Sequence, residues 1–166
     1  MKIRRKLISS LNIISIILFI IPAFELDLFK ENYSTLSLTT RGYLYILFLG
    51  ILIGILFAIE TAYISNKARG ILIFIFMFVG VMVPHHVPYN LQGNLHLLCA
   101  YIGFAGLVII TILNCGIKKY RDIYLLFIFI AILLYLKCGM VNTLSEIVVM
   151  VSSIIINMYL MLKKMV

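Results

Sequence analysis

Charged residues are scarce in this sequence. Only 12% of its 166 residues are charged, whereas 64% are hydrophobic and the mean hydropathy is +1.16. Soluble domains are close to half apolar, and a soluble fold of this length has too little interior to bury so much apolar surface. The composition therefore excludes an ordinary soluble domain and indicates a protein whose solvent is the lipid bilayer.

Motifs of metal, nucleophilic and nucleotide chemistry are also missing. The three cysteines form no C-x-x-C pair, and all of them lie inside or at the ends of apolar runs, as small packing residues do. There is no G-x-S-x-G, no P-loop, no paired carboxylate motif and no H-E-x-x-H. The sequence also lacks the repeated half with broken helices that many secondary transporters have. We therefore predict no cofactor and no metal site.

Long apolar runs separated by short polar segments are what the sequence does contain. Their lengths predict an all-α, polytopic membrane protein, a single domain over residues 1–166, with six helices in an up-and-down bundle. The six predicted spans cover about 7–26, 43–64, 71–86, 95–117, 123–141 and 146–162. In the second span Gly50, Gly54 and Ala58 recur every four residues, which favours close helix packing.

The distribution of lysine and arginine predicts the orientation. A net charge of +8 would suggest nucleic acid as the partner of a soluble protein, but here the basic residues form short clusters between apolar runs. With Lys137 set aside as intramembrane, one side of the predicted bundle holds 11 basic residues and the other only Lys30 and Arg41. We therefore predict a multi-pass protein of the cell membrane, with both termini cytoplasmic by the positive-inside rule. We predict no nucleic-acid partner.

The stretch from Val83 to His96 holds all three histidines and is the first candidate for a site. His96 begins the fourth predicted span, where it is open as a proton relay, a metal ligand, a lipid-headgroup contact or a structural hydrogen-bonding group. His85 and His86 are adjacent, so on a helix their side chains diverge by about 100°. That spacing argues against a metal site, and we interpret both as part of a wet, proline-bounded loop.

Three further candidates lie on the same predicted outer side. Glu146 either caps the sixth span in a Thr143-x-x-Glu146 capping box or faces His96 or Lys137. Lys137 extends to the headgroups, pairs with Glu146 or Glu25, or attracts a lipid phosphate. We take His96, Glu146, Lys137, His85, His86 and Glu25 as the candidate ligand-binding residues, in a pocket open to the extracytoplasmic side.

A family resemblance follows from the order of these residues. Gly93-Asn-Leu-His96-Leu-Leu-Cys-Ala100 followed by Phe104 matches a G-x-L-H-x-x-x-A-x-x-x-F pattern, and Gly139 precedes Leu144-Ser-Glu146. The chain thereby resembles the prokaryotic six-span membrane family of unknown function allied to the DRAM (damage-regulated autophagy modulator) proteins. That family carries an arginine after the glutamate, where this chain has Ile147. The resemblance implies a six-span fold and roles for His96 and Glu146, and it supplies no reaction.

Three functions are open on these grounds. The first is a non-catalytic protein that engages membrane lipid headgroups or another membrane protein through the outer polar pocket. The second is an immunity or resistance protein against a membrane-active peptide. The third is an intramembrane lipid-modifying enzyme with His96 as base and Glu146 as acid. The lack of a recognisable catalytic set favours the first.

Overall fold

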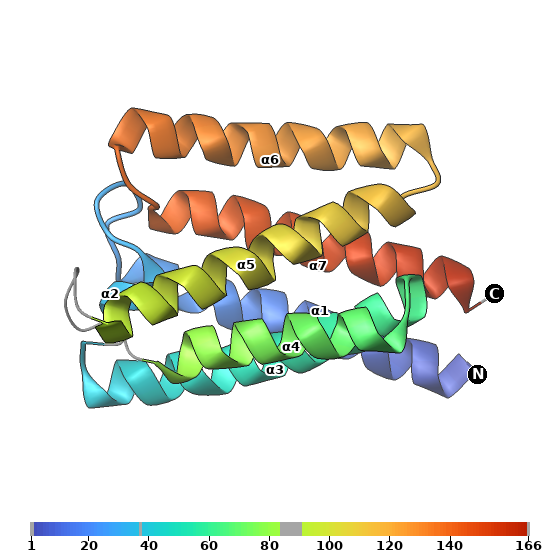
Figure 1. Ribbon diagram of the computed structural model, residues 1–166, viewed down its shortest axis with the longest axis horizontal. Helices are drawn as coiled ribbons and strands as arrows, with labels where there is room; N and C mark the ends of the chain where they lie inside the picture. Colours follow the sequence, from blue (N-terminus) through green and yellow to red (C-terminus); the bar gives the residue numbers. More distant parts are fainter. Residues whose placement is uncertain (1, 37, 84–90, 166) are drawn as a thin grey trace. The chain divides into compact units, whose positions relative to one another are not determined.

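The computed structural model describes residues 2–36, 38–83 and 91–165, which form seven α-helices, one 3-10 helix and no strand. The predicted all-helical class is thus confirmed. In chain order the elements are α1 (Lys2–Ile20), η1 (Ile21–Phe24), α2 (Tyr33–Leu36), α3 (Thr40–Ile64), α4 (Lys67–Met82), α5 (Leu91–Asn114), α6 (Lys118–Cys138) and α7 (Thr143–Lys164) (Figure 1).

Four segments of the described chain are long and apolar enough to cross a membrane. They are Arg4–Phe24, Thr40–Ile64, Gly93–Asn114 and Thr143–Lys164. These correspond to the first, second, fourth and sixth predicted spans. The 16 residues of α4 measure about 24 Å at ~1.5 Å per residue, which is less than the ~30 Å of the hydrocarbon core. The 21-residue α6 carries charged side chains at both ends.

Two α-helices end before the predicted ends of their spans, for local reasons. The α-helix of the first span ends at Ile20 and continues as the 3-10 turn η1, where Pro22 has no N–H to donate to an α-helical bond. The helix of the fifth span ends at Cys138 rather than at residue 141, because Gly139 adopts φ 70° and closes it. The predicted end of the third span, with His85 and His86, lies outside the described residues.

The chain divides into two compact units. Unit 1 comprises Met1–Tyr33 and Thr111–Val166, and unit 2 comprises Ser34–Ile110. In unit 2, α3 and α4 form an antiparallel hairpin across a short turn, where the Asn66 side chain caps α4 by accepting the Arg69 N–H at 2.9 Å (Figure 1).

Glycines bring the helices of unit 2 together. A Cβ atom on Gly50 would lie 2.5 Å from a methyl carbon of Val81, and one on Gly70 would lie 2.4 Å from the carbonyl oxygen of Ala58. Gly103 on α5 approaches the Met77 backbone of α4 in the same way, at 3.2 Å. The prediction that the small-residue face of the second span packs closely against a neighbouring helix is confirmed.

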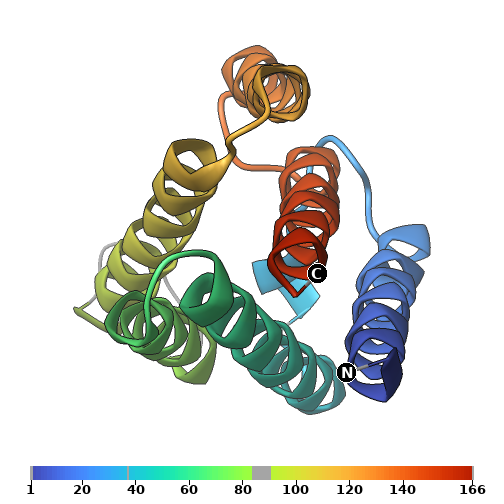
Figure 2. The same cartoon turned by 90° about the vertical axis from the view of Figure 1, so that its right-hand side faces the viewer.

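In unit 1, α7 packs against both α1 and α6 and runs antiparallel to each (Figure 2). The Arg5 guanidinium donates to the Leu162 carbonyl at 3.3 Å, which places the start of α1 beside the end of α7. The rings of Tyr120 and Tyr159, with centroids 4.5 Å apart, place the start of α6 there too. Three helix ends that carry basic residues therefore meet at one end of unit 1.

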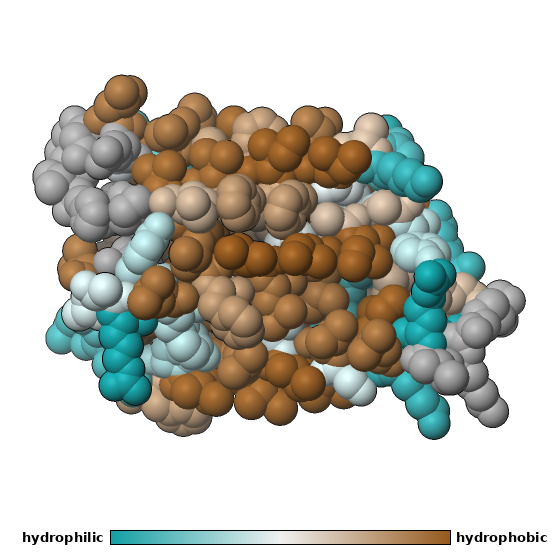
Figure 3. Space-filling view, turned by 90° about the horizontal axis from the view of Figure 1, so that it is seen from below, coloured by the Kyte–Doolittle hydropathy of each residue, from teal (hydrophilic) through white to brown (hydrophobic). Residues whose placement is uncertain are grey.

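The helices present large apolar side chains outward, as helices in contact with lipid do. The exposed apolar residues of α6 include Leu125, Leu126, Phe127, Phe129, Ile132, Leu133 and Leu136. On the face in Figure 3, apolar side chains cover most of the coloured surface.

Candidate functional site

The polar loop after η1 is tied to the start of α7, within unit 1. We call residues 25–32 the clasp loop. The backbone N–H and the hydroxyl of Thr143 both donate to the Glu31 carbonyl, at 2.7 and 2.8 Å. The Leu144 N–H donates to the Leu28 carbonyl at 3.1 Å. The first N–H groups of a helix have no partner within it, so the clasp loop supplies the acceptors that α7 lacks.

The cap of α7 differs from the predicted Thr143/Glu146 capping box. The N-cap is Asn142, whose side chain accepts the Ser145 N–H at 2.9 Å, while the Ser145 hydroxyl accepts the Asn142 N–H at 3.1 Å. The prediction is wrong by one residue, because asparagine is a better N-cap than threonine and serine closes the box in place of glutamate. Glu146 is thereby left to bond elsewhere.

Glu146 accepts the backbone N–H of Tyr33 at 2.8 Å. Tyr33 follows the clasp loop, and its buried ring stacks on Phe19 with centroids 4.3 Å apart. Its hydroxyl donates to the Phe19 carbonyl. A carboxylate in the first turn of α7 is also favoured by the helix dipole. Glu146 therefore fixes the far end of the clasp loop, as a structural acceptor.

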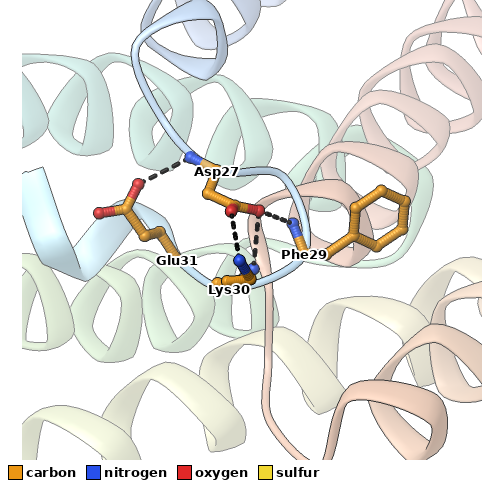
Figure 4. Close-up of polar contacts among 4 residues, drawn as sticks. All are labelled: Asp27, Phe29, Lys30 and Glu31. Carbon is orange, nitrogen blue, oxygen red and sulfur yellow. Dashed lines mark hydrogen bonds and ion pairs between the residues drawn. The ribbon is translucent and has the colours of Figure 1, made fainter.

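The first half of the clasp loop is a turn organised by its own carboxylates (Figure 4). One carboxylate oxygen of Asp27 accepts the N–H groups of Phe29 and Lys30, at 3.0 and 3.2 Å. The Phe29 N–H, with help from the Lys30 charge, holds the pKa of Asp27 below its usual 3.8. Glu31 accepts the Asp27 N–H at 2.7 Å. The other Asp27 oxygen lies 3.5 Å from the Lys30 ammonium, so the carboxylates fix the backbone and pair with a lysine whose side chain is still 83% exposed.

His96 lies in unit 2, on α5, and is half-buried. Its Nδ1 is 2.8 Å from the Val83 carbonyl oxygen, and its Nε2 is 3.3 Å from the Ser34 hydroxyl. A carbonyl only accepts, so Nδ1 carries the hydrogen, and in the neutral ring Nε2 accepts from Ser34. Of the roles left open by the sequence, these contacts favour the structural one. Its predicted convergence with Glu146, in unit 1, remains a prediction.

The other candidate residues are more dispersed. Lys137 is exposed in the last turn of α6, and Glu25 is exposed just after η1. In the part of unit 1 that the structure describes, Lys137 forms no ion pair with Glu25 or Glu146. Exposure favours the interpretation in which Lys137 extends toward headgroups.

The sequence analysis missed a buried polar chain in unit 1. The Thr111 hydroxyl donates to the Asn157 side-chain oxygen at 3.0 Å, and the Asn157 amide donates to the Ser153 carbonyl at 3.0 Å. The hydroxyls of Tyr124 and Ser153 are 2.8 Å apart. All four side chains are at most 1% exposed. The available signal was Ser153 and Asn157 four residues apart in an apolar run, hence on one helical face.

The described side chains therefore act mainly as hydrogen-bonding partners that join helices and loops. Among the described residues, no three His, Cys, Asp or Glu side chains lie close enough together to hold a metal ion. The clasp loop is hydrogen-bonded to α7 and exposes large side chains to its surroundings, so it is the part of unit 1 best suited to bind another molecule.

Comparison of the chain with protein-family models, with curated proteins and with solved structures found no match.

Proposed function

We propose that this is a six-span membrane protein with cytoplasmic termini that binds lipid headgroups or a membrane partner at its extracytoplasmic end, without catalysis. The clasp loop supplies the binding surface. The observation that carries the proposal is that this loop is held to α7 by Thr143, Leu144 and Glu146 and yet exposes large side chains.

The exposed side chains of the clasp loop, together with that of Phe24 at the end of η1, combine aromatic and cationic chemistry. Phe24 is 85% exposed, Phe29 47% and Lys30 83%. A loop without anchors would place such side chains only transiently, and ordering them on binding would cost free energy. A loop already fixed avoids that cost. An exposed phenylalanine ring gains free energy when it enters the apolar layer of a membrane or partner, while a lysine beside it keeps its ammonium among the headgroups.

The roles of the polar residues support a binding function over a catalytic one. Glu146 and Asp27 accept backbone N–H groups, and His96 bonds a backbone carbonyl. The positive-inside count supports the proposed orientation, and the four apolar segments support membrane insertion. The resemblance to the six-span family allied to the DRAM proteins remains part of the proposal, through Gly93–Ala100 and Glu146.

Photo-crosslinking tests the proposal. A photoreactive phenylalanine at Phe29 is expected to form adducts with lipid or with a membrane protein, identified by mass. Glu146→Ala is expected to lower the adduct yield, because the loop loses an anchor. The same probe at Tyr124, which is fully buried, is the matched control.

Equal yields at Phe29 and Tyr124 would contradict the proposal. So would a chemically altered lipid that accumulates with the original chain and disappears in His96→Ala, since that result identifies an enzyme.

A further inference from the structure

A second surface lies at the opposite end of unit 1, where α1 and α6 begin and α7 ends. The exposed basic residues gathered there are Arg4, Lys6, Lys118, Lys119, Lys163 and Lys164. The 21 residues of α6 separate this end from the clasp loop by about 30 Å at ~1.5 Å per residue. The two surfaces are therefore independent of each other.

An open hollow lies along the start of α6. Its lining residues are Lys118, Lys119, Asp122, Ile123 and Leu126. They are spaced so that Lys119 precedes Ile123 by four residues and Lys118 precedes Leu126 by eight, which puts the lysines and the apolar side chains on one helical face. The hollow therefore has a cationic end and an apolar end, whose midpoints are about 9 Å apart along the helix.

The charge of this hollow is positive despite Asp122. The Arg121 Nε lies 3.7 Å from an Asp122 carboxylate oxygen, so that carboxylate is balanced by a neighbour outside the hollow. Both lysines are exposed, and neither forms an ion pair among the described residues. A phosphate group would meet two cationic ammonium groups there.

The paired rings of Tyr120 and Tyr159 mark the depth of the site. Tyrosine is enriched at the level of the lipid headgroups, where its ring is in an apolar layer and its hydroxyl meets water. Tyr120 is adjacent to Lys119, and its ring contacts Tyr159 of α7. The lysines thus lie at headgroup level, and Ile123 and Leu126 lie one to two turns deeper, at the level of the acyl chains.

We propose that the start of α6 binds an anionic phospholipid, with Lys118 and Lys119 on the headgroup phosphate and Ile123 and Leu126 along an acyl chain. The proposal rests on the membrane insertion proposed above but not on the clasp loop. By the positive-inside count, this lipid belongs to the cytoplasmic leaflet, where anionic headgroups attract basic segments.

Native mass spectrometry of the full chain in detergent, titrated with phosphatidylglycerol or with phosphatidylcholine of the same acyl chains, tests the site. The original chain is expected to prefer phosphatidylglycerol. The double variant Lys118→Gln/Lys119→Gln is expected to bind it about thirty-fold more weakly, because two cationic contacts to an anionic lipid are lost. Phosphatidylcholine binding is expected to stay the same.

Matched variants separate the site from its surroundings. Lys163→Gln/Lys164→Gln removes the same charge from the end of α7 and is expected to leave the preference intact. Lys118→Arg/Lys119→Arg keeps the charge and is expected to keep the preference. Leu126→Ala is expected to weaken binding, whereas Leu136→Ala, at the other end of α6, is not.

Four outcomes would overturn the proposal. They are equal affinity for the two lipids, equal losses in the two glutamine double variants, equal losses in the two leucine variants, and displacement of the lipid by millimolar inorganic phosphate. The last would show that the lysines bind a free anion and that the apolar part of the hollow is unused. None of these outcomes bears on crosslinking at Phe29, so the two proposals fail separately.

Discussion

Glu146 is a side chain for which the sequence allows two different roles. Its position three residues after Thr143 predicts a capping box, and its charge predicts a site. The structure gives it a third role, as acceptor of the Tyr33 N–H, 113 residues earlier in the chain. Local spacing located the cap of α7 to within one residue, because a cap forms within one helical turn. It cannot reveal a partner so distant in sequence, since that depends on how the helices pack.

Replacing Glu146 tests this role. Glu146→Ala leaves the Tyr33 N–H without its acceptor, which costs about 1–3 kcal/mol for a buried donor. Glu146→Gln keeps an acceptor oxygen and is expected to cost less. The free energy of unfolding, measured by detergent titration of the purified protein, checks both. Glu25→Gln, at an exposed position, is the control, and equal effects at the two positions would contradict the assigned role.

Asp27 is expected to titrate below its ordinary pKa of 3.8, because the Phe29 N–H stabilises the carboxylate in the folded loop. Since the folded pKa is the lower one, the stabilisation is fully present above pH 3.8 and is lost as the pH falls through the folded pKa. Carbon-13 NMR of the Asp27 carboxyl measures this. Phe29→Pro removes the N–H and is expected to raise the pKa, and a value of 3.8 or higher in the original chain would contradict the bond.

The helices themselves were largely predictable, and their partners were not. The four long apolar segments are helical, as a segment that crosses a membrane must be to satisfy its own backbone. Gly50, Gly54 and Ala58 revealed a packing face, because small residues repeated every four positions let two helix backbones approach closely. The Thr111–Asn157–Ser153–Tyr124 chain was missed, since a few polar residues in an apolar run do not show which neighbours they will bond.

Removal of one hydroxyl tests that buried chain. Tyr124→Phe is expected to destabilise the packing of α6 on α7 by roughly 0.5–1.5 kcal/mol, the usual size of a hydrogen bond between membrane helices. Tyr135→Phe removes the same atom from an exposed position of the same helix and is expected to have no effect. Unfolding in detergent compares the two, and equal stabilities would contradict a stabilising role for the bond.

Close helix approach in unit 2 makes a similar prediction for Gly70. An added Cβ would lie 2.4 Å from the Ala58 carbonyl oxygen, so the α3–α4 turn would have to shift. Gly70→Ala is expected to destabilise the protein by about 1–3 kcal/mol, as overpacking does. Gly116→Ala, where a Cβ has nothing within 4 Å, is the control. Equal midpoints of thermal unfolding would show that the approach is unimportant.

At the scale of the whole molecule, the apolar composition predicts that the chain lies in a lipid bilayer, and the distribution of lysine and arginine predicts its orientation there. The structure bears out an all-helical chain with four apolar segments able to cross a membrane. The candidate site was harder to predict. Its residues were chosen for chemical type and for the side of the membrane, and neither property shows that Glu146 would bind backbone and Lys137 would face outward.

The orientation can be checked directly. In a chain with Cys99, Cys115 and Cys138 replaced by serine, single cysteines at Lys30 and Met140 are expected to react with a membrane-impermeant maleimide in intact cells. Cysteines at Lys67 and Lys119 are expected to react only after permeabilisation. All four positions are exposed. The reverse pattern would invert the topology, and labelling of all four in intact cells would contradict membrane insertion in this arrangement.

The division into units also has a consequence for biosynthesis. Unit 2 is one continuous segment, whereas unit 1 combines α1 with α6 and α7 from the far side of it in the sequence. The Arg5–Leu162 bond spans 157 residues. As the chain leaves the ribosome, α3 and α4 can pair before α7, the packing partner of α1, has been synthesised. The bonds between the clasp loop and α7 can therefore form only after α7 has been synthesised.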